Sequence, residues 1–232
     1  MRKDVRQIGA AVTKLAVDFR YFETRYELWA LSHMLEVIEP AIETLSNADL
    51  NSTLDEIHHN GWEPGEGDAQ IALQEVIEKS EYVLPRFMRG PFVVSLWACL
   101  ETGVQSVAAR HAGKTGAPIK MNELRGDGFL KRAARYFDAI LGLPLELDEK
   151  RYRRLADLYT IRCSLAHANG LRAGMSDQKW TELCNAMTRQ NLIPNERDMV
   201  VLSHDYVAQS YEDVRGCLSD LLDRAIQQEA SS

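Results

Sequence analysis

The sequence has few of the features that mark several common classes of protein. Its four cysteines, Cys99, Cys163, Cys184 and Cys217, are scattered through segments with helical spacing and form no CxxC pair. Reduced thiols are therefore expected, rather than a disulfide framework or a zinc site. No run of about eighteen apolar residues occurs, which argues against a membrane-spanning helix. A GxxxxGK[ST] phosphate loop is also missing, which argues against nucleotide hydrolysis.

The chain also lacks an excess of positive charge. Its 232 residues carry 27 Lys and Arg against 34 Asp and Glu, a formal net charge of −7. Because there is no global basic field, any contact with RNA must depend on a local group of cations. The first residues, MRKDVRQIGAAVTKLAVDF, have charges throughout and no clean apolar core, so they do not predict a signal peptide. We expect a cytoplasmic protein with no membrane partner.

Hydrophobic spacing predicts helices almost throughout the chain. In the clearest one, residues 91–113, Pro91 suits the first turn and Gly113 is the expected stop. Further helices are expected at 9–46 with a kink or break at Pro40, at 68–84 ended by Pro85, and at about 128–141, 147–168, 176–188 and 205–228. The apolar stripe of the clearest helix consists of Val93, Leu96, Trp97, Leu100, Val104 and Val107.

The remaining segments predict loops and one strand. HHNGWEPGEGD, residues 58–68, and GKTGAPIKMNELRGDG, residues 113–128, are rich in turn residues. Only DMVVLS, residues 198–203, has the composition of a strand. We expect an all-α protein with an N-terminal helical extension at 1–79 and a helical domain at 80–232, and the two could form one continuous domain.

The segment IRCSLAHANG, residues 161–170, holds the most distinctive pair of reactive side chains. Arg162 and His167 lie five positions apart at the end of a long predicted helix, and Asn169 and Gly170 follow them. Gly170 is the expected C-cap, which leaves His167 in the last helical turn. Five positions correspond to about 140° of helical rotation, so one chain does not present both side chains on a single face.

This segment resembles the Arg-x4-His signature of the HEPN superfamily (higher eukaryotes and prokaryotes nucleotide-binding). LPRFMRGPFVVSLWACLETGVQSVA and LRGDGFLKRAARYF are similar to the upstream helices of one HEPN-like branch, and VVLSHDYVAQSYEDVRGCLSDLL is similar to its closing helix. The similarity covers about residues 80–228. It implies an antiparallel helical bundle, here with extra N-terminal helices, that pairs into a symmetric homodimer and brings two copies of the motif together.

In active members, the resemblance implies an endoribonuclease that uses neither metal nor cofactor. RNA supplies its own nucleophile, the 2′-hydroxyl group. A histidine that titrates near neutrality can transfer protons, and an arginine fork can hold two phosphate oxygens. His167 is therefore expected to be the acid/base and Arg162 the phosphate clamp. Such a protein would act as a toxin or defence effector, with an antitoxin protein as a further partner.

Three supporting positions complete the candidate site. Cys163 stands where family members often have Asn or Asp, and a thiol is a poor substitute for an amide in orienting a neighbour. Asn169 stands where some toxin members have a tyrosine that a partner nucleotidyltransferase modifies. Glu101, at the border of the apolar stripe, could orient Arg162 or His167.

Basic residues upstream of the motif provide a possible path for RNA. The run KRYRRLADLYTIR, residues 150–162, contains Arg151 and Arg154, which are expected to contact RNA phosphates. Lys131, Arg132 and Arg135 could extend this group into a local positive strip.

Other interpretations of the same residues stay open. Arg162 could pair with an acid such as Asp157 or with exposed carbonyls, and His167 could only cap its helix. The chain could then be a non-catalytic HEPN scaffold that binds RNA or a protein partner, or a helical adaptor that docks a partner helix through the stripe around Trp97. His58 and His59 are metal-ligand types, but neighbouring helical residues point in different directions and no metal site is expected.

Overall fold

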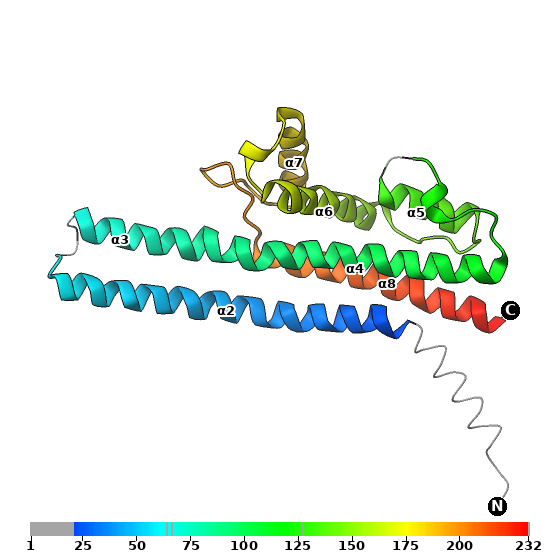
Figure 1. The fold of residues 1–232 in the computed structure, drawn as a ribbon, viewed down its shortest axis with the longest axis horizontal. Helices are drawn as coiled ribbons and strands as arrows, with labels where there is room; N and C mark the ends of the chain where they lie inside the picture. The colour runs from blue at the N-terminus through cyan, green and yellow to red at the C-terminus, as the bar shows by residue number, and fades with distance from the viewer. Residues whose placement is uncertain (1–20, 64, 66, 127, 232) are drawn as a thin grey trace, which may run out of the picture. The chain divides into compact units, whose positions relative to one another are not determined.

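The computed structural model describes residues 21–63, 65, 67–126 and 128–231. In this part of the chain the fold is all α, without a strand, which confirms the expected class (Figure 1). The helices are α2 (Phe22–Asn60), α3 (Gly67–Glu78), α4 (Leu84–Thr115), α5 (Phe129–Ala139), α6 (Glu149–Ala168), α7 (Asp177–Arg189) and α8 (His204–Ser231). Short helical turns add Lys79–Val83, Met121–Glu123 and Arg172–Gly174. The expected helical residues 9–20 lie outside the described residues.

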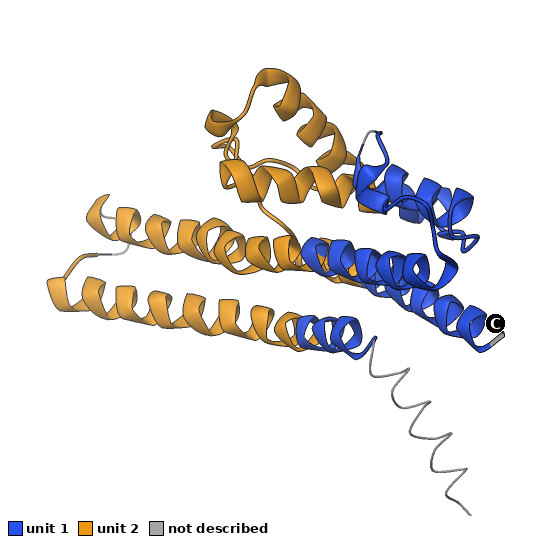
Figure 2. Ribbon diagram, turned by 45° about the vertical axis from the view of Figure 1, so that its right-hand side comes forward, with its two compact units in different colours: residues 1–31, 97–153, 212–232 blue, residues 32–96, 154–211 orange. Residues whose placement is uncertain are grey.

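The chain divides into two compact units, which Figure 2 shows in different colours. Among the described residues, unit 1 comprises those in the ranges 21–31, 97–153 and 212–231, and unit 2 comprises those in the ranges 32–96 and 154–211. The long helices α2, α4, α6 and α8 each contribute residues to both units. The division expected at residues 79 and 80 falls inside unit 2, within one continuous helical run from α3 to α4.

Prolines interrupt the helices less than the sequence predicts. α2 continues through Pro40, α4 contains Pro91 in its interior, and the run from α3 continues through Pro85. The expected stop at Pro85 and the expected start at Pro91 are therefore wrong. The physical reason at Pro85 is the π-helical turn Lys79–Val83, where the Leu84 N–H donates to the Lys79 carbonyl five residues back. This wider turn accommodates a residue that has no N–H to donate.

Two further expectations are corrected by backbone geometry. α4 passes the expected stop at Gly113 and ends at Thr115, because Gly116 has a left-handed φ of 65°. The segment 198–203, expected to be a strand, forms only one antiparallel bridge, between Leu171 and Met199. A single bridge supplies too few hydrogen bonds for a sheet.

The apolar stripe expected on α4 is buried along its whole length. Its six residues, from Val93 to Val107, are at most 1% exposed. In unit 1 the Trp97 ring meets the Phe129 ring edge-on, with centroids 6.1 Å apart. Because Trp97 is 1% exposed, the interpretation in which this stripe docks a partner helix is wrong.

The helical run Gly67–Thr115 contains a window that is apolar enough to cross a membrane, judged by length and composition alone. In the structure, 56% of that window is buried. Buried core helices pass the same test, so this is weak evidence for a membrane span.

A charged cluster stabilises the end of α8 in unit 1. The Glu229 carboxylate accepts hydrogen bonds from Arg110 Nη2 at 2.7 Å, and Lys114 Nζ lies 2.8 Å from it. These cations, with the Arg110 hydrogen bond as the largest cause, hold the pKa of Glu229 at about 2. Beside them lies His111, 3% exposed, whose Nε2 has no hydrogen-bond partner among the described residues. Burial lowers the pKa of His111 below its ordinary 6.5.

The lowered pKa values of His111 and Glu229 predict that the protein loses stability in two stages as the pH falls. Below about pH 6.5 the unfolded chain binds a proton that buried His111 resists, so stability falls. The contribution of Glu229 is fully present above its ordinary pKa of 4.5 and is lost as the pH approaches 2. Urea midpoints measured from about pH 7.5 to pH 3 test this. The variant His111→Phe should lose stability less steeply between pH 7 and pH 5, and an unchanged profile would contradict the role of His111.

Candidate functional site

Arg162 and His167 lie on α6, within unit 2. His167 is exposed in the last helical turn, whereas Arg162 is half-buried. The Arg162 guanidinium lies over the ring of Tyr159, one turn back along the helix, at 4.8 Å from the ring centroid. Because a helix turns by about 100° per residue, Arg162 and His167 point in different directions from the same helix.

The helix ends through two consecutive residues in the left-handed region, Asn169 with φ 52° and Gly170 with φ 70°. The chain reversal thus begins one residue before the expected C-cap at Gly170, at an asparagine, a residue type that tolerates this conformation. The Gly170 N–H donates to the Ser164 carbonyl at 3.0 Å, and the Leu171 N–H donates to the Ala168 carbonyl at 2.9 Å. These bonds end α6 directly after His167 and Ala168.

The segment 198–200 holds this reversal from one side. The Val200 N–H donates to the Gly170 carbonyl at 2.9 Å, and the Arg172 N–H donates to the Asp198 carbonyl at 3.1 Å. The Arg172 side chain also pairs with the Asp198 carboxylate at 3.2 Å. The segment that the sequence suggested as a strand therefore serves to fix the chain just after the motif.

α4 holds the reversal from another direction. Arg86 Nε donates to the Asn169 carbonyl at 3.1 Å, and Arg86 Nη1 lies 3.6 Å from the Met199 sulfur. One turn further along α4, a Cβ on Gly90 would lie 3.7 Å from Leu165. His167 is therefore an exposed side chain on a backbone that is fixed on two sides.

Arg86 is a site residue that the sequence reasoning missed. It places a second cation beside the helix end that carries His167, and its guanidinium lies 5.3 Å from the centroid of the exposed Phe87 ring. The segment LPRFMRGP offered a signal, because it contains two arginines in one helical turn. Of the two, Arg89 has a structural role: it binds the Glu39 carboxylate at 2.6 and 2.7 Å and the Leu202 carbonyl at 2.6 Å. The Arg89 hydrogen bond lowers the pKa of Glu39.

The other expected site residues are divided between the two units. Cys163, Asn169 and Arg154 belong to unit 2 with the motif, whereas Glu101 and Arg151 belong to unit 1. Arg151 pairs with Asp220 at 2.9 Å, so its charge is partly neutralised.

The acid considered as a partner for Arg162 is engaged elsewhere. Asp157 is 2% exposed and accepts hydrogen bonds from Arg189 Nη2 at 2.5 Å and from Gln190 at 2.7 Å. These bonds satisfy both carboxylate oxygens and connect α6 to the end of α7.

The described residues contain no group of three or more His, Cys, Asp and Glu that could hold a metal ion. His58 and His59 are exposed at the end of α2. Burial raises the pKa of the Cys99 and Cys217 thiols to about 12, so these two cysteines are poor nucleophiles at neutral pH.

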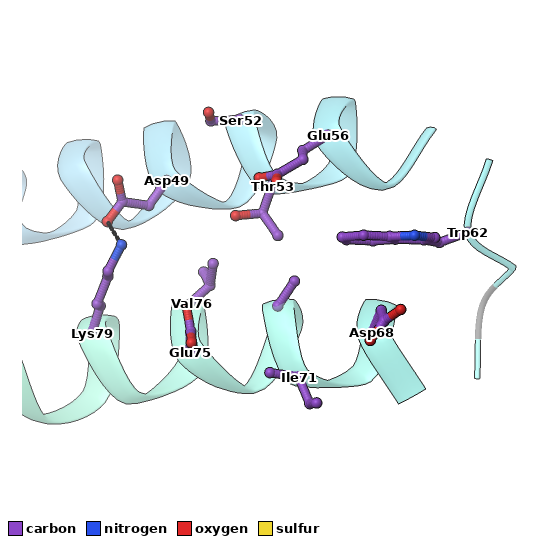
Figure 3. A pocket seen from close by; sticks show the side chains of 11 residues that line it. Asp49, Ser52, Thr53, Glu56, Trp62, Asp68, Ile71, Glu75, Val76 and Lys79 are labelled. Carbon is purple, nitrogen blue, oxygen red and sulfur yellow. Dashed lines mark ion pairs between the residues drawn. The ribbon is translucent and has the colours of Figure 1, made fainter. Parts of the chain in front are cut away.

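An open hollow lies between the end of α2 and the start of α3, away from the motif in sequence (Figure 3). The Trp62 ring stands at one end, and Lys79 pairs with Asp49 at 3.9 Å at the other. Carboxylates predominate among the charged groups that line it: Asp49, Glu56, Asp68 and Glu75. Their negative charge would repel a phosphate, so this hollow does not suit RNA.

The packing around Gly170 predicts that a side chain there disturbs the site. A Cβ on Gly170 would lie 3.2 Å from both Leu165 and Val200, in addition to the strain of its positive φ. Gly170→Ala should lower the free energy of unfolding by about 2–4 kcal/mol in urea titrations.

Gly61→Ala is the matched control. Gly61 has a similar φ of 68° but no atom within 4 Å of its Cβ position, so only the backbone cost of about 1–2 kcal/mol applies. Equal losses for the two variants would show that the contacts with Leu165 and Val200 are unimportant.

Comparisons of the chain with protein-family models, with curated proteins and with solved structures found no match.

Proposed function

We propose that the protein is a HEPN-like, metal-independent endoribonuclease that acts as a homodimer, with His167 as the acid/base and Arg162 as the phosphate clamp. The observation that carries this proposal is the geometry at the end of α6. There an exposed histidine stands on a backbone that is held by Arg86 and by the segment 198–200. A rigid backbone with an accessible imidazole suits proton transfer, because the reacting atoms must be placed within a few tenths of an ångström.

The chemistry needs only groups that RNA and this chain possess. His167 accepts the proton of a 2′-hydroxyl group while that oxygen attacks the adjacent phosphorus. The bond from phosphorus to the 5′-oxygen of the next nucleotide breaks, and that oxygen takes a proton from an imidazolium group. The products are a 2′,3′-cyclic phosphate and a 5′-hydroxyl end.

Charge stabilisation comes from arginine. The phosphate gains negative charge in the transition state, and a planar guanidinium can donate two hydrogen bonds to its oxygens. Arg162 and His167 point about 140° apart on one helix, so one copy does not direct both at a single phosphate. A second copy, with its α6 near the two-fold axis, would complete the site.

The alternative is a non-catalytic HEPN scaffold that binds RNA or a protein partner. The packing of Arg162 on Tyr159 favours it, because a guanidinium that is half-buried on a ring of its own helix can serve architecture alone. Cys163 next to the arginine supports the same interpretation, since a thiol orients a neighbour weakly.

Assembly provides the first test of the proposal. At micromolar concentration the protein should scatter light as a particle of twice the 26.3 kDa chain mass. A strict monomer at that concentration would contradict a site built from two copies.

Substitutions at the motif separate catalysis from architecture. His167→Ala should lower the rate of RNA cleavage by ~10²- to 10⁴-fold and leave RNA affinity within a few-fold of the parent, because only proton transfer is lost. Arg162→Lys keeps the charge but loses the planar fork, so cleavage should again fall strongly. His59→Ala, at an exposed histidine on the end of α2, is the control and should cleave at the parental rate. Cleavage of end-labelled RNA, measured in EDTA, gives the rates.

Mixed dimers test whether the site is shared. If one copy supplies Arg162 and the other His167, mixing the two inactive variants should restore up to about a quarter of the parental activity. Cleavage by His167→Ala at the parental rate would overturn the proposed function. So would full loss of activity in EDTA with rescue by a divalent ion, which would indicate metal chemistry.

A further inference from the structure

Most arginines of this acidic protein are neutralised by its own carboxylates. In the described part of the chain, at least ten arginines lie within 4.0 Å of an Asp or Glu oxygen. Arg110 with Glu229 and Arg189 with Asp157 are examples. A cation that already has a carboxylate partner gains little from an additional anion, because it must exchange one for the other.

One group of cations differs from this pattern. This group, the α5 cluster, consists of Arg125, Lys131, Arg132 and Arg135, all in unit 1. None of the four forms an ion pair with a carboxylate of the described residues, and the chain from 120 to 135 carries five Lys and Arg against two Asp and Glu. Arg125, Lys131 and Arg135 are exposed, and Arg132 is half-buried.

Two of the four side chains, those of Arg132 and Arg135, lie against the loop that carries Arg125. Arg135 Nη1 donates to the Arg125 carbonyl at 3.4 Å. A Cβ on Gly126 would lie 3.7 Å from Arg135 Nη1 and 3.8 Å from Arg132 Cγ, so both arginines lie over this glycine. Lys131 and Arg135 are four positions apart on α5 and therefore share a face.

A buried face anchors the cluster to the core of unit 1. Phe129, Ala133 and Phe137 of α5 are at most 6% exposed. The Tyr136 hydroxyl donates to the Ile119 carbonyl at 2.8 Å, which ties the preceding loop to the helix. Asp138, three positions beyond Arg135, limits the positive face at the end of the helix. The cations thus project from a fixed helix and the loop before it.

We propose that the α5 cluster binds phosphate groups of the RNA backbone. Cations held close together repel one another, and a polyanion relieves this repulsion while its counterions are released. The contacts are to phosphates and therefore independent of sequence. The inference rests on the proposed action on RNA. It assigns the phosphate contacts to the α5 cluster in place of Arg151, because Arg151 pairs with Asp220.

The test compares two double variants of the full chain that change the net charge equally. Lys131→Gln with Arg135→Gln removes two exposed cations of the cluster. Lys150→Gln with Arg153→Gln removes an exposed lysine and an exposed arginine of α6 and serves as the control. All proteins also carry His167→Ala, so that the RNA stays intact. Binding of a fluorescent single-stranded RNA is measured by anisotropy at several salt concentrations.

The α5 variant should bind RNA about 10- to 30-fold more weakly near 0.1 M salt, and its slope of log affinity against log salt should be shallower by about 1.4. The control should stay within about threefold of the parent. The loss should be equal for RNAs of different sequence. Equal weakening in both variants, or an unchanged α5 variant, would overturn the inference.

The outcomes also distinguish this inference from the proposed catalysis. Loss of binding in the α5 variant, combined with no cleavage by a protein that retains His167, supports the cluster and contradicts the ribonuclease. Cleavage that survives removal of the cluster at unchanged KM supports the ribonuclease and contradicts the cluster. If the parent binds no RNA but binds an acidic protein through this cluster, the inference is overturned in favour of a protein partner.

Discussion

The reversal of the chain at Asn169 and Gly170 is the constraint on which the candidate site depends. Two consecutive left-handed residues end α6, and the bonds from Val200 and Arg86 to their carbonyls hold the reversal in place. A Cβ at Gly170 would crowd Leu165 and Val200, so glycine is required both by its φ and by the packing. His167 owes its exposure and its fixed backbone to this arrangement.

Positive charges in this protein are neutralised mainly by carboxylates close to them. With a net charge of −7, most arginines are paired with carboxylates, and some of these pairs join elements far apart in the sequence, such as Arg89 with Glu39. Exposed pairs, such as Arg153 with Glu149, contribute little to stability, but they neutralise cations that an anionic partner could otherwise contact. The four cations of the α5 cluster and Arg86 have no ion pair with a carboxylate of the described residues.

The sequence predicted the helices well where a buried face set their spacing. The stripe from Val93 to Val107 and the bounds of α6, α7 and α8 agree with the structure to within a few residues. The errors occur where a single residue type was taken as a signal. Pro85 does not end a helix, because the π-helical turn Lys79–Val83 before it accommodates a residue without an N–H. Pro91 does not begin a helix, because it lies in the interior of α4. Gly113 did not end α4, because the left-handed position is at Gly116.

By itself, the sequence determined the all-α class, the buried stripes and the placing of Arg162 and His167 near a helix end, because hydrophobic spacing and helical rotation are local properties. Only the tertiary structure decided which residues surround the motif. Arg86 lies 83 positions before Asn169 in the sequence, and no local pattern reveals that its guanidinium binds the Asn169 carbonyl. The tertiary structure also decided which cations are neutralised. Whether an arginine meets a carboxylate depends on which chain segments the burial of apolar surface brings together, and neither residue alone encodes that.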